Sequence, residues 1–377
     1  MRRTFAASVL GRLPIGITGL AVLLLVQSST QSFAQAGAAT AGYVGGLAIV
    51  APVLGRWIDR TGPRAALLLC GLSFPATLLA LVAAVDYGAP GWLIVVLSAS
   101  AGAVFPPISV CMRTYFRHRL ADERLLAAAY SLESVLIELV FIVGPMLVAI
   151  FVALASPAFA VVFAAACGGA GALLFRASSA LRAWTVAPKP RRGLLGPLAE
   201  PQFSILVVII LCYAMAFGLL EIGITAYATE QARPALAGVL LGLMSAGSAL
   251  GGLAYGSRSW RFPLQRQFVA ILAIMGLGLA VLALPWDPWT FAALTIVAGI
   301  VMAPALIMQS MLVARAAGHG HVTEAFTWST SALLGGIGIG LVAGGALVEL
   351  WLSSAAFATA AATALAAAVA GRFVLRS

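Results

Sequence analysis

The chain has 377 residues, of which 62% are hydrophobic and 9% are charged, and its formal net charge is +10 at pH 7. Soluble domains carry about 25% charged residues, so this composition excludes a water-soluble globule and predicts an integral membrane protein. The apolar runs are continuous and do not alternate with polar residues, which excludes an outer-membrane barrel and indicates membrane-spanning helices.

Twelve apolar windows follow one another, each close to the length of about 20 residues that a helix needs to cross a bilayer. The first window also resembles a secretory signal, because Arg2 and Arg3 precede its apolar run. We favour a spanning helix, since removal of the segment would leave an odd number of spans. The predicted spans are residues 13–35, 38–58, 65–85, 91–112, 125–150, 157–175, 203–228, 235–256, 266–285, 289–312, 323–347 and 350–371.

Nearly all basic residues fall on one side of the membrane when the predicted spans cross it in turn. With the amino terminus in the cytoplasm, 21 of the 22 Lys and Arg residues lie on the cytoplasmic side and only Arg233 lies outside. This asymmetry predicts that both termini are cytoplasmic. The positive charge is therefore interpreted as a topology signal, with some attraction to anionic lipid, and not as a nucleic-acid surface. The preference for Arg over Lys indicates a GC-rich genome, and hence a bacterial plasma membrane.

One long connection, residues 176–202, divides six predicted helices from six. It is basic and broken by prolines, which predicts a cytoplasmic linker between an N-terminal bundle, residues 1–175, and a C-terminal bundle, residues 203–377. The halves repeat at a constant offset of 197 residues, and six spans in each half give the two repeats the same orientation. Matched pairs include Gly45 with Gly242, Gly55 with Gly252, Arg64 with Arg261 and Pro107 with Pro304.

Glycine and charge are densest in residues 55–64, between the second and third predicted spans. This segment reads Gly-Arg-Trp-Ile-Asp-Arg-Thr-Gly-Pro-Arg. The pattern resembles the signature loop of the major facilitator superfamily of secondary transporters. The resemblance implies an all-α integral membrane fold of twelve transmembrane helices, built as two six-helix parallel repeats. It also implies transport by alternating access, with no enzyme activity and no cofactor.

Five residues of this signature loop have expected roles. Gly55 would allow a neighbouring helix to approach closely, and Gly62 would permit a tight turn. The resemblance implies that Asp59 meets the positive end of a helix in the other half and holds a cytoplasmic gate shut, with Arg60 and Arg64 in reach. Such a contact is worth about 0.3–1 kcal/mol when exposed and up to about 2 kcal/mol when partly buried. The alternative is a simple turn flanked by cytoplasmic positive charge.

The second copy of the loop, residues 252–261, has lost the acid, because Gly256 stands where Asp59 would be. Three other acids, Glu133, Glu138 and Glu221, lie well inside predicted spans. A charge at that depth costs roughly 2.5–3.5 kcal/mol on insertion scales, so these groups are candidates for proton coupling. Glu221 ranks first, because seventh helices line the central cavity in the superfamily. The alternative for each is an interhelical hydrogen bond that fixes packing.

The direction of transport and the substrate rest on weaker signals. Gly144-Pro145 in the fifth span resembles a motif of drug–proton antiporters, which favours export. The predicted spans contain no Lys or Arg well inside them, which argues against anionic substrates. Candidate cavity residues are Gln27, Thr30, Gln31, Tyr213, Thr225 and Tyr227, with Gln309, Ser310, Thr327, Ser329 and Thr330 as weaker ones.

Enzymatic and metal chemistry find little support. No phosphate-binding loop occurs around Lys189, and His118, His319 and His321 fall in loops without further ligands, so no metal site is expected. The predicted function is proton-coupled export of a small, partly hydrophobic compound by a monomer in the lipid bilayer. The alternatives are proton-coupled nutrient uptake, and a membrane sensor or assembly partner that keeps the fold without transporting.

Overall fold

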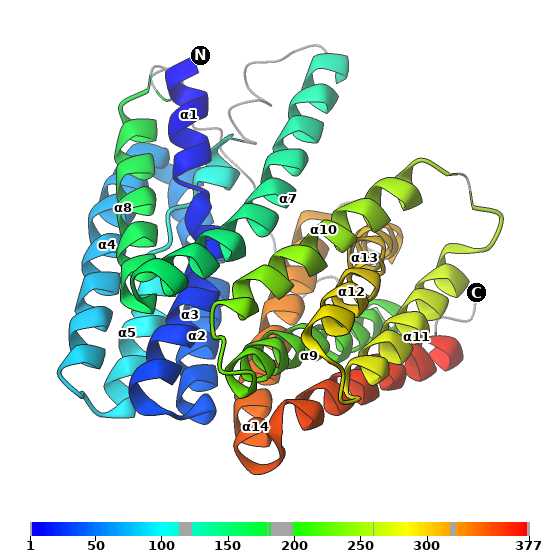
Figure 1. Ribbon diagram of the computed structural model, residues 1–377. Helices are drawn as coiled ribbons and strands as arrows, with labels where there is room; N and C mark the ends of the chain where they lie inside the picture. Colours follow the sequence, from blue (N-terminus) through cyan, green and yellow to red (C-terminus); the bar gives the residue numbers. More distant parts are fainter. Residues whose placement is uncertain are drawn as a thin grey trace. The chain divides into compact units, whose positions relative to one another are not determined.

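The computed structural model describes residues 2–112, 123–178, 181, 198, 200–258, 260–316 and 322–374. All regular elements in these ranges are helices (Figure 1). The linker at residues 182–197 and the three histidines lie outside the described residues. Asp59, Arg60, Glu133 and Glu138 lie in helices, but their side chains are outside the described part of the structure.

The chain forms two compact units, residues 1–31 with 42–190, and residues 32–41 with 191–377. Helix α3 therefore contributes its first turns to the second unit and the remainder to the first. The first unit contains α1 (Arg2–Leu10), α2 (Leu13–Thr30), most of α3 (Phe33–Thr61), α4 (Pro63–Asp86), α5 (Gly91–Ala103), α7 (Glu123–Leu154) and α8 (Pro157–Arg176). The second contains α9 (Pro201–Glu230), α10 (Leu236–Gly256), α11 (Leu264–Leu282), α12 (Pro288–Gly299), α13 (Met302–Ala316) and α14 (Val322–Val374).

Ten helical segments among the described residues are long and apolar enough to cross a membrane. One of them, Ala325–Phe373, is two helices, because Trp351 and Leu352 have non-helical backbone angles and bend α14 (Figure 1). Helix α7 is not among the ten, although its apolar part Leu139–Leu154 is described. With α7 and the two arms of α14, the described helices account for the twelve predicted spans.

The first predicted span, residues 13–35, is wrong at both ends. Its apolar segment runs from Ala6 to Thr30 and includes a break between α1 and α2. At the other end Gln31 adopts a left-handed conformation with φ 56°, and its N–H donates to the Gln27 carbonyl at 2.8 Å. This cap ends α2. Arg12, at the start of α2, therefore lies inside a membrane segment with only 2% of its surface exposed, against the prediction of no such cation.

The internal repeat is confirmed by where helices begin and break. Helices α5 and α12 begin at Gly91 and Pro288, which are 197 residues apart. Both then break at matched positions: α5 ends before Val104, and the break between α12 and α13 includes Val301. Two predicted spans, 91–112 and 289–312, are thus each interrupted near the cytoplasmic third of the predicted crossing.

One pair of serines at helix starts follows the same offset. Ser156 accepts a hydrogen bond from the Phe159 N–H at 3.2 Å and begins α8. Its counterpart Ser353 begins the second arm of α14, where its N–H and hydroxyl each donate to the Glu230 carboxylate at 2.7 Å. Asp287 caps α12, and hydrogen bonds from Thr290 hold the pKa of its carboxyl below the ordinary value. Carboxylates placed this way satisfy the free N–H groups of a helix start.

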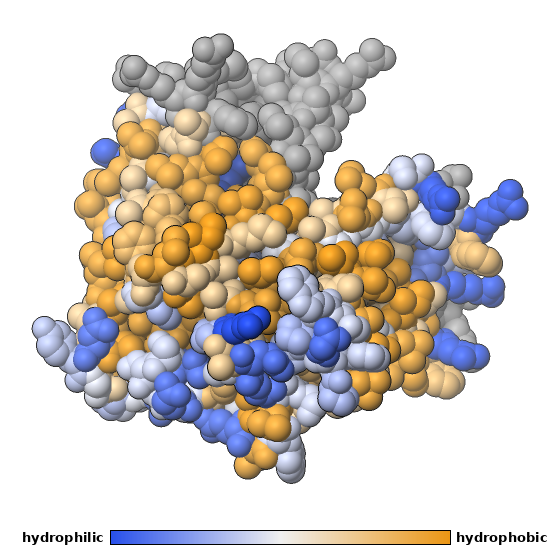
Figure 2. Space-filling model, in the orientation of Figure 1, coloured by the Kyte–Doolittle hydropathy of each residue, from blue (hydrophilic) through white to orange (hydrophobic). Residues whose placement is uncertain are grey.

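Glycines bring the second and fourth membrane spans of each unit together. A Cβ at Gly46 of α3 would collide with the backbone of Ala99, and one at Gly102 of α5 would collide with that of Tyr43. In the second unit, Gly251 and Gly299 make the same kind of contact between α10 and α12. Many large hydrophobic side chains are instead exposed, and hydrophobic residues occupy much of the face drawn in Figure 2, as expected of helices that face lipid.

The predicted orientation can be tested by labelling single cysteines. Tyr87, between α4 and α5, is 90% exposed, and Ser257 is exposed after α10, beside arginine-bearing residues 258–261. We expect Tyr87→Cys to react with a membrane-impermeant maleimide on intact cells and Ser257→Cys to react only after permeabilisation, because basic loops stay inside. The background replaces Cys70, Cys111, Cys167 and Cys212 by Ala. The opposite labelling pattern would reverse the orientation.

Candidate functional site

The signature loop joins α3 to α4 by a turn that only glycine adopts readily. The Thr61 hydroxyl donates to the Trp57 carbonyl at 2.9 Å, and the Gly62 N–H donates to the Ile58 carbonyl at 2.8 Å. Gly62 then has φ 83° and ψ 165°, and Pro63 begins α4. This backbone conformation is essentially restricted to glycine. The expected role of Gly62 in a tight turn therefore agrees with the geometry.

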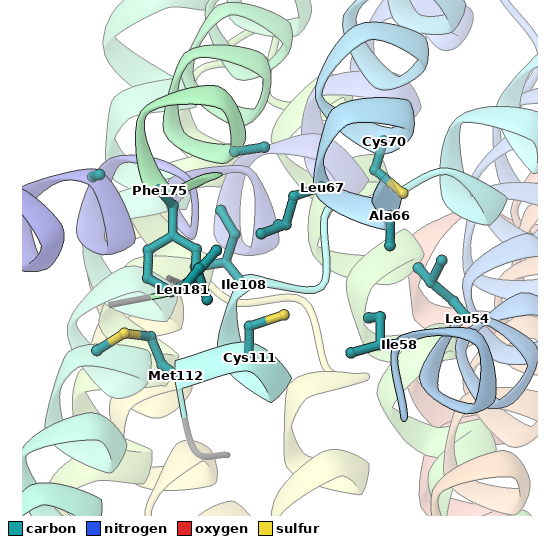
Figure 3. Packing of buried hydrophobic residues seen from close by; sticks show 12 residues of the cluster. Leu54, Ile58, Ala66, Leu67, Cys70, Ile108, Cys111, Met112, Phe175 and Leu181 are labelled. Carbon is teal, nitrogen blue, oxygen red and sulfur yellow. The ribbon is translucent and has the colours of Figure 1, made fainter. Parts of the chain in front are cut away.

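A hydrophobic cluster anchors this loop at one end of the first unit (Figure 3). Ile58 from the loop and Leu54 one turn before it point toward α4 and toward the short helical segment after α5. Trp57 packs against the same cluster from a partly buried position. The other members are Ala7, Ala66, Leu67, Cys70, Ile108, Cys111, Met112, Ala172, Phe175 and Leu181. The apolar positions of the loop thus fix its place against α4 and the segment after α5.

The remaining positions of the loop are less constrained in the described structure. Arg64 is exposed at the start of α4. Among the described residues, no atom lies within 4 Å of a Cβ built on Gly55, so the expected close approach of a neighbouring helix is not found there. In the second copy, a Cβ on Gly252 would lie 3.0 Å from the Ala303 Cβ, so that glycine does mark a close approach. The side chains of Asp59 and Arg60 are outside the described part.

Glu221 lies on α9 in a stretch of helix that is otherwise buried. From Gly218 to Ala228, every residue except Glu221 is buried, whereas Glu221 retains partial exposure. No described residue donates a hydrogen bond to its carboxylate or pairs with it. Glu221 is therefore partly exposed, and no hydrogen bond or ion pair with a described residue holds its carboxylate. The alternative prediction, an interhelical hydrogen bond through Glu221, is not seen among the described residues.

A buried polar network lies on the same helix. The Tyr213 hydroxyl of α9 donates to Gln309 Oε1 of α13. Gln309 Nε2 in turn donates to the Ser329 hydroxyl of α14 at 2.7 Å. All three side chains are buried, and the Tyr213 ring makes edge contacts with Phe217 and Phe268. A satisfied network of this kind joins three helices rigidly, because leaving any member unpaired would cost about 1–3 kcal/mol.

The other two cavity candidates on α9 also face the interior of the second unit. The Thr225 hydroxyl donates to the Glu221 carbonyl at 2.8 Å and is fully buried. The Tyr227 hydroxyl donates to the Trp286 carbonyl at 3.0 Å, and its ring stacks on Phe291 at a centroid distance of 3.9 Å. In this conformation these side chains are engaged in packing.

The candidates of the first helix separate into two groups. Gln27 is buried in α2, and the Thr30 hydroxyl donates back to the Val26 carbonyl at 2.7 Å. Gln31 is exposed beyond the end of the helix, and its Nε2 donates to the Ser28 carbonyl at 2.8 Å. Gln31 therefore does not continue the helical face of Gln27, because the left-handed cap turns the chain away.

The Gly144-Pro145 pair lies inside α7 where that helix crosses α2. A Cβ at Gly144 would collide with the backbone of Gly16, and one at Gly16 would collide with the Val140 carbonyl. Pro145 sits within the helix. The two backbones are therefore in direct contact, and this packing explains the glycine without reference to the direction of transport.

Sequence reasoning did not identify Glu349, which binds the first turn of α3 within the second unit. Its Oε1 accepts hydrogen bonds from the Ser32 hydroxyl and, at 3.1 Å, from the Ala34 N–H. A carboxylate at a helix start satisfies free N–H groups and complements the helix dipole. Ser32 and Glu349 are 317 residues apart, so no local pattern could have predicted the pair.

A model of the family described as Major Facilitator Superfamily matches residues 4–232, which is more than half of the chain. The chain belongs to the major facilitator superfamily. Membership establishes a multi-pass integral membrane protein that acts as a secondary transporter of a small molecule, and not as an enzyme. The predicted fold class is confirmed.

Two solved structures of nucleoside transporter NupG share the fold. One, of an aspartate-to-alanine variant, has a TM-score of 0.81 and 14% sequence identity, and covers 99% of this chain and 100% of that one. The other has a TM-score of 0.76 and 13% identity, and covers 100% of both chains. At these identities the likeness shows the superfamily fold alone. No match was found among curated proteins.

The two glycines of the signature loop should respond oppositely to alanine. Gly62→Ala is expected to lower stability by about 1–3 kcal/mol, because a Cβ is strained at its backbone angles. Gly55→Ala is expected to raise stability by about 0.5–1 kcal/mol, because it lies in a helix with open space around it. Thermal unfolding of the two purified variants in detergent measures both effects.

A transport assay on the same two variants separates packing from gating. If Gly55→Ala is as stable as expected but no longer transports, another helix approaches Gly55 in a different conformation. If Gly62→Ala is as stable as the parent protein, the turn does not require glycine and its interpretation is wrong.

Proposed function

We propose that this transporter takes up a small uncharged nutrient together with protons, and that nucleosides are the first substrates to test. Both similar structures are described as a nucleoside transporter, and a nucleoside is an uncharged nutrient with a planar base and a polar sugar. That chemistry agrees with a membrane interior that has few charges. It favours the uptake alternative over the export that the sequence first indicated.

The sequence motif that favoured export has another explanation. Export rested on the likeness of Gly144-Pro145 to a motif of drug–proton antiporters. Contact between Gly144 and the backbone of Gly16 accounts for the glycine by packing alone. No other residue singled out in the sequence favours export, so uptake is the better-supported proposal.

The partial exposure of Glu221 carries the coupling part of the proposal. It is the one residue between Gly218 and Ala228 that is not buried, and it lies in a helix of 30 mostly apolar residues. A charge at that depth is costly, and protonation removes the cost. Binding a proton from one side and releasing it to the other would therefore be linked to the change in access. Glu133 and Glu138 remain secondary candidates.

Other features complete the proposal. Residues 1–175 and 203–377 would act as the two bundles, joined by a cytoplasmic linker at 176–202, in a monomer of a bacterial plasma membrane. Both termini would be cytoplasmic, in keeping with the distribution of basic residues. Asp59 would close the cytoplasmic side by its charge, and Arg60 and Arg64 would lie at the same surface.

Proteoliposomes with an inward proton gradient test substrate and coupling together. The parent protein is expected to accumulate labelled uridine or adenosine against its gradient. Glu221→Gln, which mimics the protonated acid, should abolish accumulation while downhill exchange partly survives, because the shape of the binding site is nearly unchanged. Glu200→Gln is the matched control, since Glu200 is exposed just before the same helix. It should accumulate substrate normally.

The outcomes of this experiment are distinct. If Glu221→Gln, Glu133→Gln and Glu138→Gln all retain substrate-dependent proton flux, coupling by a carboxylate is wrong. If only Glu138→Gln fails, the proton site belongs to α7. If intact cells that express the protein expel the compound and do not accumulate it, the direction is export.

The gate is tested by Asp59→Asn. Loss of a charge–dipole contact of about 0.3–2 kcal/mol should shift the equilibrium towards the state that is open to the cytoplasm and should lower transport severely. Cysteine accessibility from the cytoplasmic side should rise, while expression and thermal stability should not change. Asp86→Asn, an exposed acid at the end of α4, is the control. Full transport by Asp59→Asn would show that the loop acts only as a turn and not as a gate.

A further inference from the structure

A cavity lies in the part of the second unit where the second copy of the signature loop, residues 252–261, has no acid. The second unit contains a cavity of about 500 Å³ between α10, α11 and the α12–α13 segment, beside residues 252–261. This volume falls within the range of about 300–1,000 Å³ that is typical of ligand pockets. Ile271, Ile274 and Met308 are among the apolar residues that form its wall.

The rim of this cavity is built by hydrogen bonds and ring contacts. The Tyr255 hydroxyl donates to Gln267 Oε1 at 2.8 Å, and Gln267 Nε2 donates to the Phe262 carbonyl at 2.6 Å. Trp260 stacks on Tyr255 at a centroid distance of 5.4 Å, and its Nε1 donates to the Tyr255 carbonyl at 3.1 Å. These bonds tie the loop after α10 to the first turns of α11, so the cavity is preformed.

The charge at the rim is positive only. Arg258 and Arg266 line the cavity. None of the acids in the described part of the chain lines it. At the matching position the first loop carries Asp59, whereas the second carries Gly256. The second copy thus presents arginines without an acid of its own.

The cavity also opens onto a surface suited to lipid. Trp260 is 47% exposed, Ile274 is 52% exposed and Phe262 is 68% exposed, although all three line the cavity. Aromatic side chains of this kind gather where a bilayer meets water. The site therefore combines an apolar wall with a cationic, aromatic rim, which is the chemistry of a lipid with a negative headgroup.

We propose that this cavity binds an anionic phospholipid of the cytoplasmic leaflet. Its phosphodiester would lie against Arg258 and Arg266, and an acyl chain would follow Ile271 and Ile274. Basic pockets between helices on the cytoplasmic side bind such headgroups, and each arginine near the membrane surface adds to the attraction. The site is separate from Glu221 and independent of the transported substrate.

Native mass spectrometry of the purified full-length protein tests the site with two lipids, phosphatidylglycerol and phosphatidylcholine of the same chains. We expect phosphatidylglycerol to bind more tightly to the parent protein. Arg258→Gln and Arg266→Gln should each weaken that binding about fivefold, and the double variant should weaken it about 30-fold. Binding of phosphatidylcholine should hardly change. Arg372→Gln, an exposed arginine in the last turn of α14 outside the cavity, should leave both lipids unaffected.

A second variant tests the apolar wall. Ala270→Trp would fill the cavity from α11, so it should reduce binding of phosphatidylglycerol without removing an arginine. Thermal unfolding of each variant shows whether it is folded. Equal binding of the two lipids to the parent protein would overturn the proposal. So would full competition by glycerol phosphate, which would indicate a site for free phosphates, or an equal loss of binding in Arg372→Gln.

Discussion

Neighbouring helices in both units approach so closely at glycines that a single Cβ would collide with the backbone opposite. Gly16 and Gly144 make this contact between α2 and α7, and Gly218 and Gly340 make it between α9 and α14. In a bilayer, an apolar side chain gains little free energy when it moves from lipid to a helix interface, because both are apolar. Close packing of the helix backbones therefore has to hold the bundle together. The crossing points of the helices, and hence the direction of every other side chain, depend on these glycines.

Such tight packing leaves few places for polar groups. Tyr213, Gln309 and Ser329 occupy one of them and satisfy one another across three helices. Glu221, only about two turns from Tyr213 on the same helix, has no such partner among the described residues. This arrangement fits the proton coupling proposed for Glu221, because the carboxyl could change its charge without disturbing the hydrogen bonds that hold the three helices together.

Sequence reasoning predicted the fold from two long-range regularities, the apolar windows and the repeat at a constant offset. Both depend on composition along the chain and need no knowledge of partners. It failed where a single residue ends a helix: the left-handed turn at Gln31 has no glycine to mark it. It also could not choose the direction of Tyr227 on α9, since helical spacing says which residues share a face and not which helix that face meets. Glu349 was missed because its partners Ser32 and Ala34 are more than 300 residues away in the sequence.

The fourth and tenth spans break at matched residues, Val104 and Val301. Pro107 and Pro304 follow the two breaks at matched positions, whereas Pro106 before the first of them has Ala303 as its counterpart. A helix break that stays at matched positions while a neighbouring residue differs is typical of a feature inherited through duplication. The simplest history places the break in an ancestral chain of six helices, before gene duplication and fusion produced this protein. The same history makes the difference between Asp59 and Gly256 a change that arose after the duplication, in one of the two copies.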